Sequence, residues 1–229
     1  MTDKPMIFSA EMVRALLDGR KIQTRRALKP QPPADAHMVR AYTDNAPRPA
    51  LRNTIGWFVP EAGDLWPCND GDRIPLRYAP GDRLWVREAC RAVEHEDGTD
   101  AVEYLADGAV AQIKNCAKAA DQWGELYRYG KRGPDRTHRH GQKVPSIHMP
   151  RWASRLTLVV TDVRVQRVRE ISRDDAIAEG CPSTLTAEWH FRDLWNSLYG
   201  PDAWDRNDWV VAITFTVHRC NIDQMEAAQ

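Results

Sequence analysis

Residues 19–26, GRKIQTRR, are the stretch around which the chain is organised. Before this stretch, apolar residues recur at helical spacing and predict a helix over Ala10–Asp18, with Ser9 as its N-cap. Gly19 stands where a helix C-terminus commonly takes a left-handed residue, so the helix should end there. The chain should then turn sharply and redirect Lys21 away from the helix.

From Thr24 onward the chain should be extended. In a strand, successive side chains point to opposite faces, so Thr24 and Arg26 should share one face while Arg25 lies on the other. The stretch therefore predicts a polar corner between a helix and a strand.

Outside this corner, periodicity predicts a small set of elements. Strands are predicted at Arg83–Glu88, Val102–Leu105, Leu156–Val168 and Trp209–Val217, and helices from Ser172 to Glu179-Gly180 and over Thr186–Leu198. Two long segments, at about 30–79 and 106–146, show little periodicity and are interpreted as loop-rich insertions, the first of them proline-rich. Residues 221–229 are expected to fray. The order predicts one α+β domain over residues 1–229, a small mixed sheet or barrel with peripheral helices.

Composition excludes several classes of protein. Among 229 residues, 32 Lys and Arg balance 32 Asp and Glu, which removes the global positive field of a protein that coats nucleic acid indiscriminately. The five cysteines contain no CxxC pair, a pattern that suits a reducing cytosol. No apolar run is long enough for a membrane helix, and the N-terminal residues do not look like a signal peptide. We therefore expect a cytoplasmic protein.

The pattern Gly19-x-Lys21-x-x-Thr24-x-Arg26 resembles the signature of ASCH domains, which have a PUA-like β-barrel. Further landmarks follow in the family's order: Gly81-Asp82 before a strand, Ile171–Gly180 as a late helix, and Trp209–Phe215 as a closing strand. The resemblance implies a PUA-like mixed β-barrel with peripheral helices, and both insertions fall outside the minimal domain.

One departure from the family pattern points to a subgroup. ASCH domains often have glutamate where this chain has Thr24. N4-acetylcytidine amidohydrolases are similar in having Lys-x-x-Thr here and a glutamate on the later helix, matching Lys21, Thr24 and Glu179. The chain also resembles larger ASCH proteins encoded by phages and prophages. The likeness implies a hydrolase that removes the acyl group from N4-acylated cytosine or cytidine, a modified nucleoside or nucleobase, without a cofactor or metal.

Amide hydrolysis needs a nucleophile, a base and an acid. The resemblance assigns these roles to Thr24, Lys21 and Glu179, respectively. Backbone N–H groups at the Gly19 turn, or the Arg26 side chain, could stabilise the oxyanion. The alternative is structural: Lys21 and Thr24 as an exposed lysine and a strand-favouring threonine, and Glu179 as a helix-terminal acid paired with a basic neighbour.

Aromatic residues beside arginines suggest a surface for stacking a base. Trp85 lies near Arg87, and Trp152 follows Arg151, so these two tryptophans are the better candidates, although core packing is the competing interpretation. Arg26, Trp85, Arg87 and Trp152 are thus the candidate substrate-binding residues. Three tryptophans are instead expected on apolar faces: Trp189, Trp195 and Trp209.

A binding protein is the alternative to an enzyme. The PUA-like resemblance and two basic stretches, Arg14–Lys29 and Lys131–Lys143, favour an RNA-binding module without catalysis. By itself, Lys131–Lys143 fits either a solvated loop or a loop that contacts phosphate. His138, His140 and His148 lack a recognisable ligand spacing, so no metal is predicted.

Overall fold

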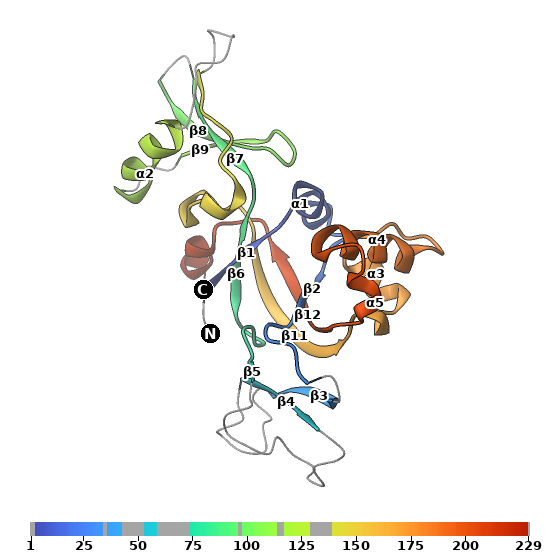
Figure 1. The fold of residues 1–229 in the computed structure, drawn as a ribbon. Helices are drawn as coiled ribbons and strands as arrows, with labels where there is room; N and C mark the ends of the chain where they lie inside the picture. Colours follow the sequence, from blue (N-terminus) through green and yellow to red (C-terminus); the bar gives the residue numbers. More distant parts are fainter. Residues whose placement is uncertain are drawn as a thin grey trace. The chain divides into compact units, whose positions relative to one another are not determined.

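The computed structural model describes residues 3–33, 36–42, 53–58, 74–95, 98–113, 117–128 and 139–228 (Figure 1). It confirms a mixed α+β fold, built mostly of strands. The strands are β1 (Asp3–Ile7), β2 (Gln23–Ala27), β3 (His37–Tyr42), β4 (Thr54–Phe58), β5 (Ile74–Pro75), β6 (Arg83–Arg87), β7 (Cys90–Glu94), β8 (Asp100–Tyr104), β9 (Val110–Gln112), β10 (Arg139–His140), β11 (Thr157–Arg167) and β12 (Trp209–His218). The α-helices are α1 (Ala10–Leu17), α2 (Ala117–Arg128), α3 (Arg173–Ala178), α4 (Ala187–Tyr199) and α5 (Ala203–Arg206). Short 3₁₀ segments cover Ser146–His148, Arg151–Ala153, Val168–Glu170 and Ile222–Ala228.

The described strands form three open sheets. Their orders are β1-β6-β11-β12-β2, β10-β7-β8-β9 and β3-β4-β5. None of the three closes on itself, so the predicted barrel is not what the described strands form. Within the same part of the chain, no helix is long and apolar enough to cross a membrane.

The chain divides into two compact units. The first contains Met1–Gly19, Arg83–Leu158 and Val217–Gln229, and the second contains Arg20–Asp82 and Val159–Thr216. In the first unit, β1 runs parallel to β6, and β7, β8 and β9 pair antiparallel (Figure 1). Its core gathers apolar side chains from β7, β8 and the segment before β11: Cys90, Ala92, Val102, Tyr104, Val144, Met149 and Ala153.

In the second unit, β2 pairs antiparallel with β12, and α3 contacts both β2 and α4. The register sets Thr24 opposite Ile213. Buried residues of α4 recur at helical spacing, with Phe191 and Trp195 stacked at 5.9 Å between ring centroids. They pack in one core with Val168, Ile171, Ala176, Cys181, Ala187, Ala203 and Val210.

The predicted helix ends are confirmed where local residues decide them. Ser9 caps α1, its Oγ accepting from the Met12 N–H at 3.4 Å, and Ser172 caps α3 by accepting from the Asp175 N–H at 3.1 Å. Gly19 takes φ of 71° after α1. These features depend on neighbours in the sequence, so sequence patterns capture them.

Three expectations differ from the structure. The segments interpreted as loop-rich contain the helix α2 and five strands whose short lengths leave little periodicity: β3, β4, β5, β9 and β10. The C-terminal segment does not fray over its described residues, because Ile222 is buried and Asn221 binds three main-chain carbonyls. Trp189 is 66% exposed, because it lies off the stripe of α4 that Phe191 and Trp195 bury.

The conformation of Gly19 gives a first prediction. Gly19→Ala should lower the free energy of unfolding by about 1–2 kcal/mol, because a Cβ disfavours the left-handed region. Gly124→Ala in α2 is the matched control. It has equally open space around its Cβ position but no positive φ, so it should raise stability by about 0.5–1 kcal/mol. Chemical denaturation measures both. Equal effects of the two substitutions would contradict the assigned role of Gly19.

Candidate active site

Lys21 is held against the end of α3 in the second unit. The backbone of Lys21 forms an isolated antiparallel bridge with Glu179, and the Ile22 N–H donates to the Ala178 carbonyl at 2.9 Å. Arg20 Nη1 adds a bond to the Gly180 carbonyl at 3.1 Å. The segment before β2 is therefore tied to the helix end that carries Glu179.

Two of the three predicted catalytic residues are in direct contact. Lys21 Nζ donates to Glu179 Oε2 at 2.7 Å and to the Glu179 main-chain oxygen at 2.7 Å, across 158 residues of sequence. Glu179 is the C-cap of α3, which aims its side chain back toward Lys21. Lys21 is 0% exposed and Glu179 4%, so this is a buried ion pair, and Lys21 is not the exposed lysine of the structural alternative.

Arg25 extends this pair into a network. Its Nη1 donates to Glu179 Oε1 at 3.1 Å and its Nη2 to Asp175 Oδ2 at 2.7 Å. Arg164 Nη2 reaches the other Asp175 oxygen at 3.1 Å. From the sequence, Arg25 was expected only to lie on the strand face opposite Thr24 and Arg26. A signal was available, because Asp175 and Glu179 are four residues apart and so share a helix face, which suits one bridging guanidinium.

Burial shapes the electrostatics of the cluster. Loss of hydration lowers the pKa of Lys21, an effect that the Glu179 charge opposes and the Arg26 charge reinforces. Burial also raises the pKa of the neighbouring Cys181 thiol to about 11, with the Glu179 charge adding to the shift. Cys181 is therefore a neutral thiol at physiological pH, and the site favours an uncharged amine on Lys21 more than water does.

Thr24 lies on β2 and is 1% exposed. Arg25 donates to Gln23 Oε1, so these two side chains share a face of β2, and alternation places Thr24 and Arg26 on the other face. Lys21 precedes the strand, and its pKa is raised by the Glu179 charge and lowered by the Arg26 charge. The structure thus joins Lys21 to Glu179 directly, whereas Thr24 lies on the strand face opposite Arg25, which contacts Glu179.

The other predicted residues belong to the first unit. Trp85 is buried on β6, and the Arg87 guanidinium lies 5.2 Å from the centre of its ring. Trp152 Nε1 donates to Gln122 Oε1 at 2.8 Å. Both tryptophans therefore have partners within their own unit.

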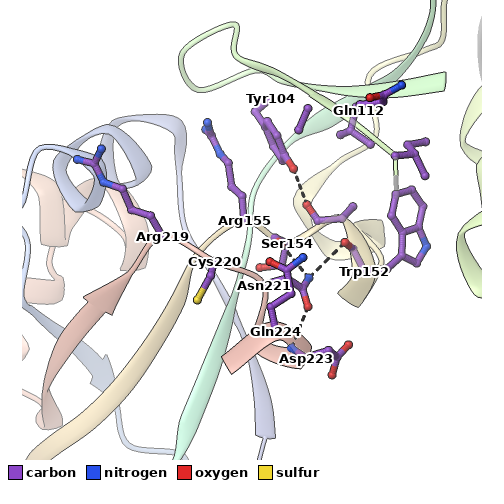
Figure 2. A pocket seen from close by; sticks show the side chains of 14 residues that line it. Tyr104, Gln112, Trp152, Ser154, Arg155, Arg219, Cys220, Asn221, Asp223 and Gln224 are labelled. Carbon is purple, nitrogen blue, oxygen red and sulfur yellow. Dashed lines mark hydrogen bonds between the residues drawn. The ribbon is translucent and has the colours of Figure 1, made fainter. Parts of the chain in front are cut away.

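Trp152 lines a pocket of about 370 Å³ (Figure 2). On one wall, Tyr104 donates its hydroxyl to the Ala153 carbonyl at 2.9 Å. Arg155 lies 4.1 Å from the Tyr104 ring centre and is paired with Glu88 and Asp107. The polar side chains of this pocket are thus largely satisfied within the protein, and they brace its wall.

Among the residues described, no three His, Cys, Asp or Glu side chains gather where they could hold a metal ion. His138 lies outside the described residues, as does most of Lys131–Lys143.

Comparison of the chain with protein-family models, curated proteins and solved structures found no match.

Proposed function

We propose that this protein is an amidohydrolase that removes the acyl group from N4-acylated cytosine or cytidine, with Thr24 as nucleophile, Lys21 as base and Glu179 as acid. The proposal combines the ASCH-like, PUA-like sequence signature with one structural observation, the buried contact between Lys21 and Glu179 at 2.7 Å. The five cysteines contain no CxxC pair, a pattern that favours the reducing cytoplasm as the place of this activity.

The contact supports the proposal because the pair can share one proton. An ammonium beside a carboxylate and an amine beside a carboxylic acid hold the same number of protons, and transfer along the hydrogen bond interconverts them. Burial lowers the pKa of Lys21, so the arrangement with an uncharged amine is closer in free energy to the ion pair than it would be in water. That arrangement supplies a base and an acid together, as acyl transfer requires.

The proposed reaction then balances in two steps. Lys21 takes the Thr24 proton as Oγ1 attacks the acyl carbonyl, and Glu179 gives its proton to the departing N4 amine. Water next attacks the acyl-threonine and passes a proton to Glu179, while Lys21 returns a proton to Oγ1. Arg26, on the same strand face as Thr24, is the proposed oxyanion partner.

Burial sets a condition on this reaction. Lys21 and Thr24 are almost completely covered, at 0% and 1% exposed, so a covering segment must move before the acyl group reaches Oγ1. The proposal therefore includes an opening step, and turnover is limited by that step or by the chemistry.

The test is incubation of purified protein with N4-acetylcytidine while cytidine and acetate are measured. The proposal requires both products in equal amounts. Salt-dependent RNA binding without hydrolysis would instead support the binding module. Lys21 and Arg25, two cations of the basic stretch Arg14–Lys29, are buried in ion pairs, which leaves that stretch less charge to offer RNA.

A further inference from the structure

Within the part of the chain that the structure describes, Arg87 is an arginine without an acidic partner. It ends β6 in the first unit and is only partly exposed, and its Nε is buried with no hydrogen-bond partner among the described residues. The adjacent acid, Glu88, is held by both Nε and Nη2 of Arg155. Loss of hydration lowers the pKa of Arg87, and no nearby charge opposes this effect. A desolvated guanidinium in this state is costly unless an anion joins it.

Arg87 lines a pocket of about 700 Å³, a size typical of small-molecule sites. Lys143 and His148 are the other basic groups among its described lining residues, none of which is acidic. Gln122 and Gln142 add amide donors. Positive charge and donors therefore converge on one space, with no acid among the lining residues that the structure describes.

We propose that this pocket binds a small phosphomonoester through its phosphoryl group. A phosphoryl group carries nearly two negative charges and several acceptor oxygens, which matches a guanidinium, an ammonium and an imidazole better than a single carboxylate does. The planar fork of Arg87 suits two of those oxygens, and its position over the Trp85 ring limits its orientation.

The rest of the lining indicates an organic ligand rather than bare phosphate. Ile147 and Met149 give the pocket an apolar wall, and its volume is far larger than one phosphoryl group needs. RNA is less favoured, because the anchoring arginine is recessed in a pocket rather than placed on an open basic track. Lys143 ends the basic stretch Lys131–Lys143, so this end of the stretch fits the phosphate-contacting alternative.

Calorimetric titration with phenyl phosphate tests the proposal, because this probe joins a phosphoryl group to an apolar ring. We expect one saturable site per chain, with benzoate and phenol binding more weakly. Arg87→Gln should weaken binding by about tenfold or more, because it removes a charged hydrogen-bonding partner. Lys143→Gln should weaken it less, because Lys143 is exposed.

Arg91→Gln is the matched control. Arg91 lies on the adjacent β7, is paired with Glu103 and does not line the pocket, so this variant should bind phenyl phosphate like the wild type. Arg87→Gln should unfold at the same temperature as the wild type or higher, since it removes a desolvated charge.

Equal affinity of wild type and Arg87→Gln would overturn the proposal. Benzoate binding as tightly as phenyl phosphate would also overturn it, as would RNA binding without any phenyl phosphate binding. The pocket and the Lys21 cluster share no residue, so failure here leaves the amidohydrolase proposal standing, and the reverse also holds.

Discussion

Lys21→Met should lower kcat/KM for N4-acetylcytidine by about 10³-fold, within the usual range for loss of a general base. Methionine has a similar length and no charge. Glu179 keeps its bond from Arg25 at 3.1 Å, so the carboxylate is not left unpaired and the second unit should still fold. Steady-state rates measure the loss, and circular dichroism checks the fold.

The pH profile separates a catalytic role for Lys21 from a structural one. The active pair holds one shared proton, so the wild-type profile should be bell-shaped, with activity falling at high pH when that proton is lost. Because burial lowers the pKa of Lys21, this fall should occur below the ordinary lysine value of 10.5. A wild-type rate for folded Lys21→Met would remove Lys21 from the mechanism.

Glu179→Gln should destabilise the protein by about 3–5 kcal/mol, because it removes a carboxylate charge that two buried cations share. Lys21 and Arg25 are both 0% exposed at their side chains, and each gives a charged hydrogen bond to this carboxylate. The amide keeps the shape but removes the charge. Denaturant unfolding monitored by tryptophan fluorescence measures the difference.

Asp193→Asn is the control for Glu179→Gln. Asp193 pairs with Arg192 in the same unit, but the two side chains are 69% and 46% exposed, so the loss should stay below about 1 kcal/mol. Adding Lys21→Met to Glu179→Gln should recover part of the lost stability, since it removes the buried Lys21 charge that Glu179 offset. Equal costs of the two carboxylate substitutions would mean that the buried network contributes little.

The sequence predicts those features that neighbouring residues determine. Ser9 and Gly19 bound α1 through bonds to residues a few positions away, so residue type alone predicts them. The short strands β3, β4 and β5 were missed because a strand of a few residues among prolines shows no clear alternation. What stabilises such strands is pairing, which is not a local property.

The same distinction between local and non-local features applies to the candidate site. The contact of Lys21 with Glu179 was expected only through the resemblance, because nothing local links residues 158 positions apart. The bridging role of Arg25 depends on the packing of α3 against β2, and the pocket at Arg87 assembles from separate segments. That no described acid pairs with Arg87 can be known only from its three-dimensional neighbours.

Thr24 Oγ1 is the proposed nucleophile, and this role can be tested by the rate at which Thr24→Ala releases cytidine from N4-acetylcytidine. Threonine to alanine removes the hydroxyl and one methyl group, a small loss of volume, so the variant should fold and bind substrate. Because the nucleophile is lost, its rate should be at least about 10³-fold below that of the wild type. Cytidine release by folded Thr24→Ala at the wild-type rate would exclude Thr24 as the nucleophile.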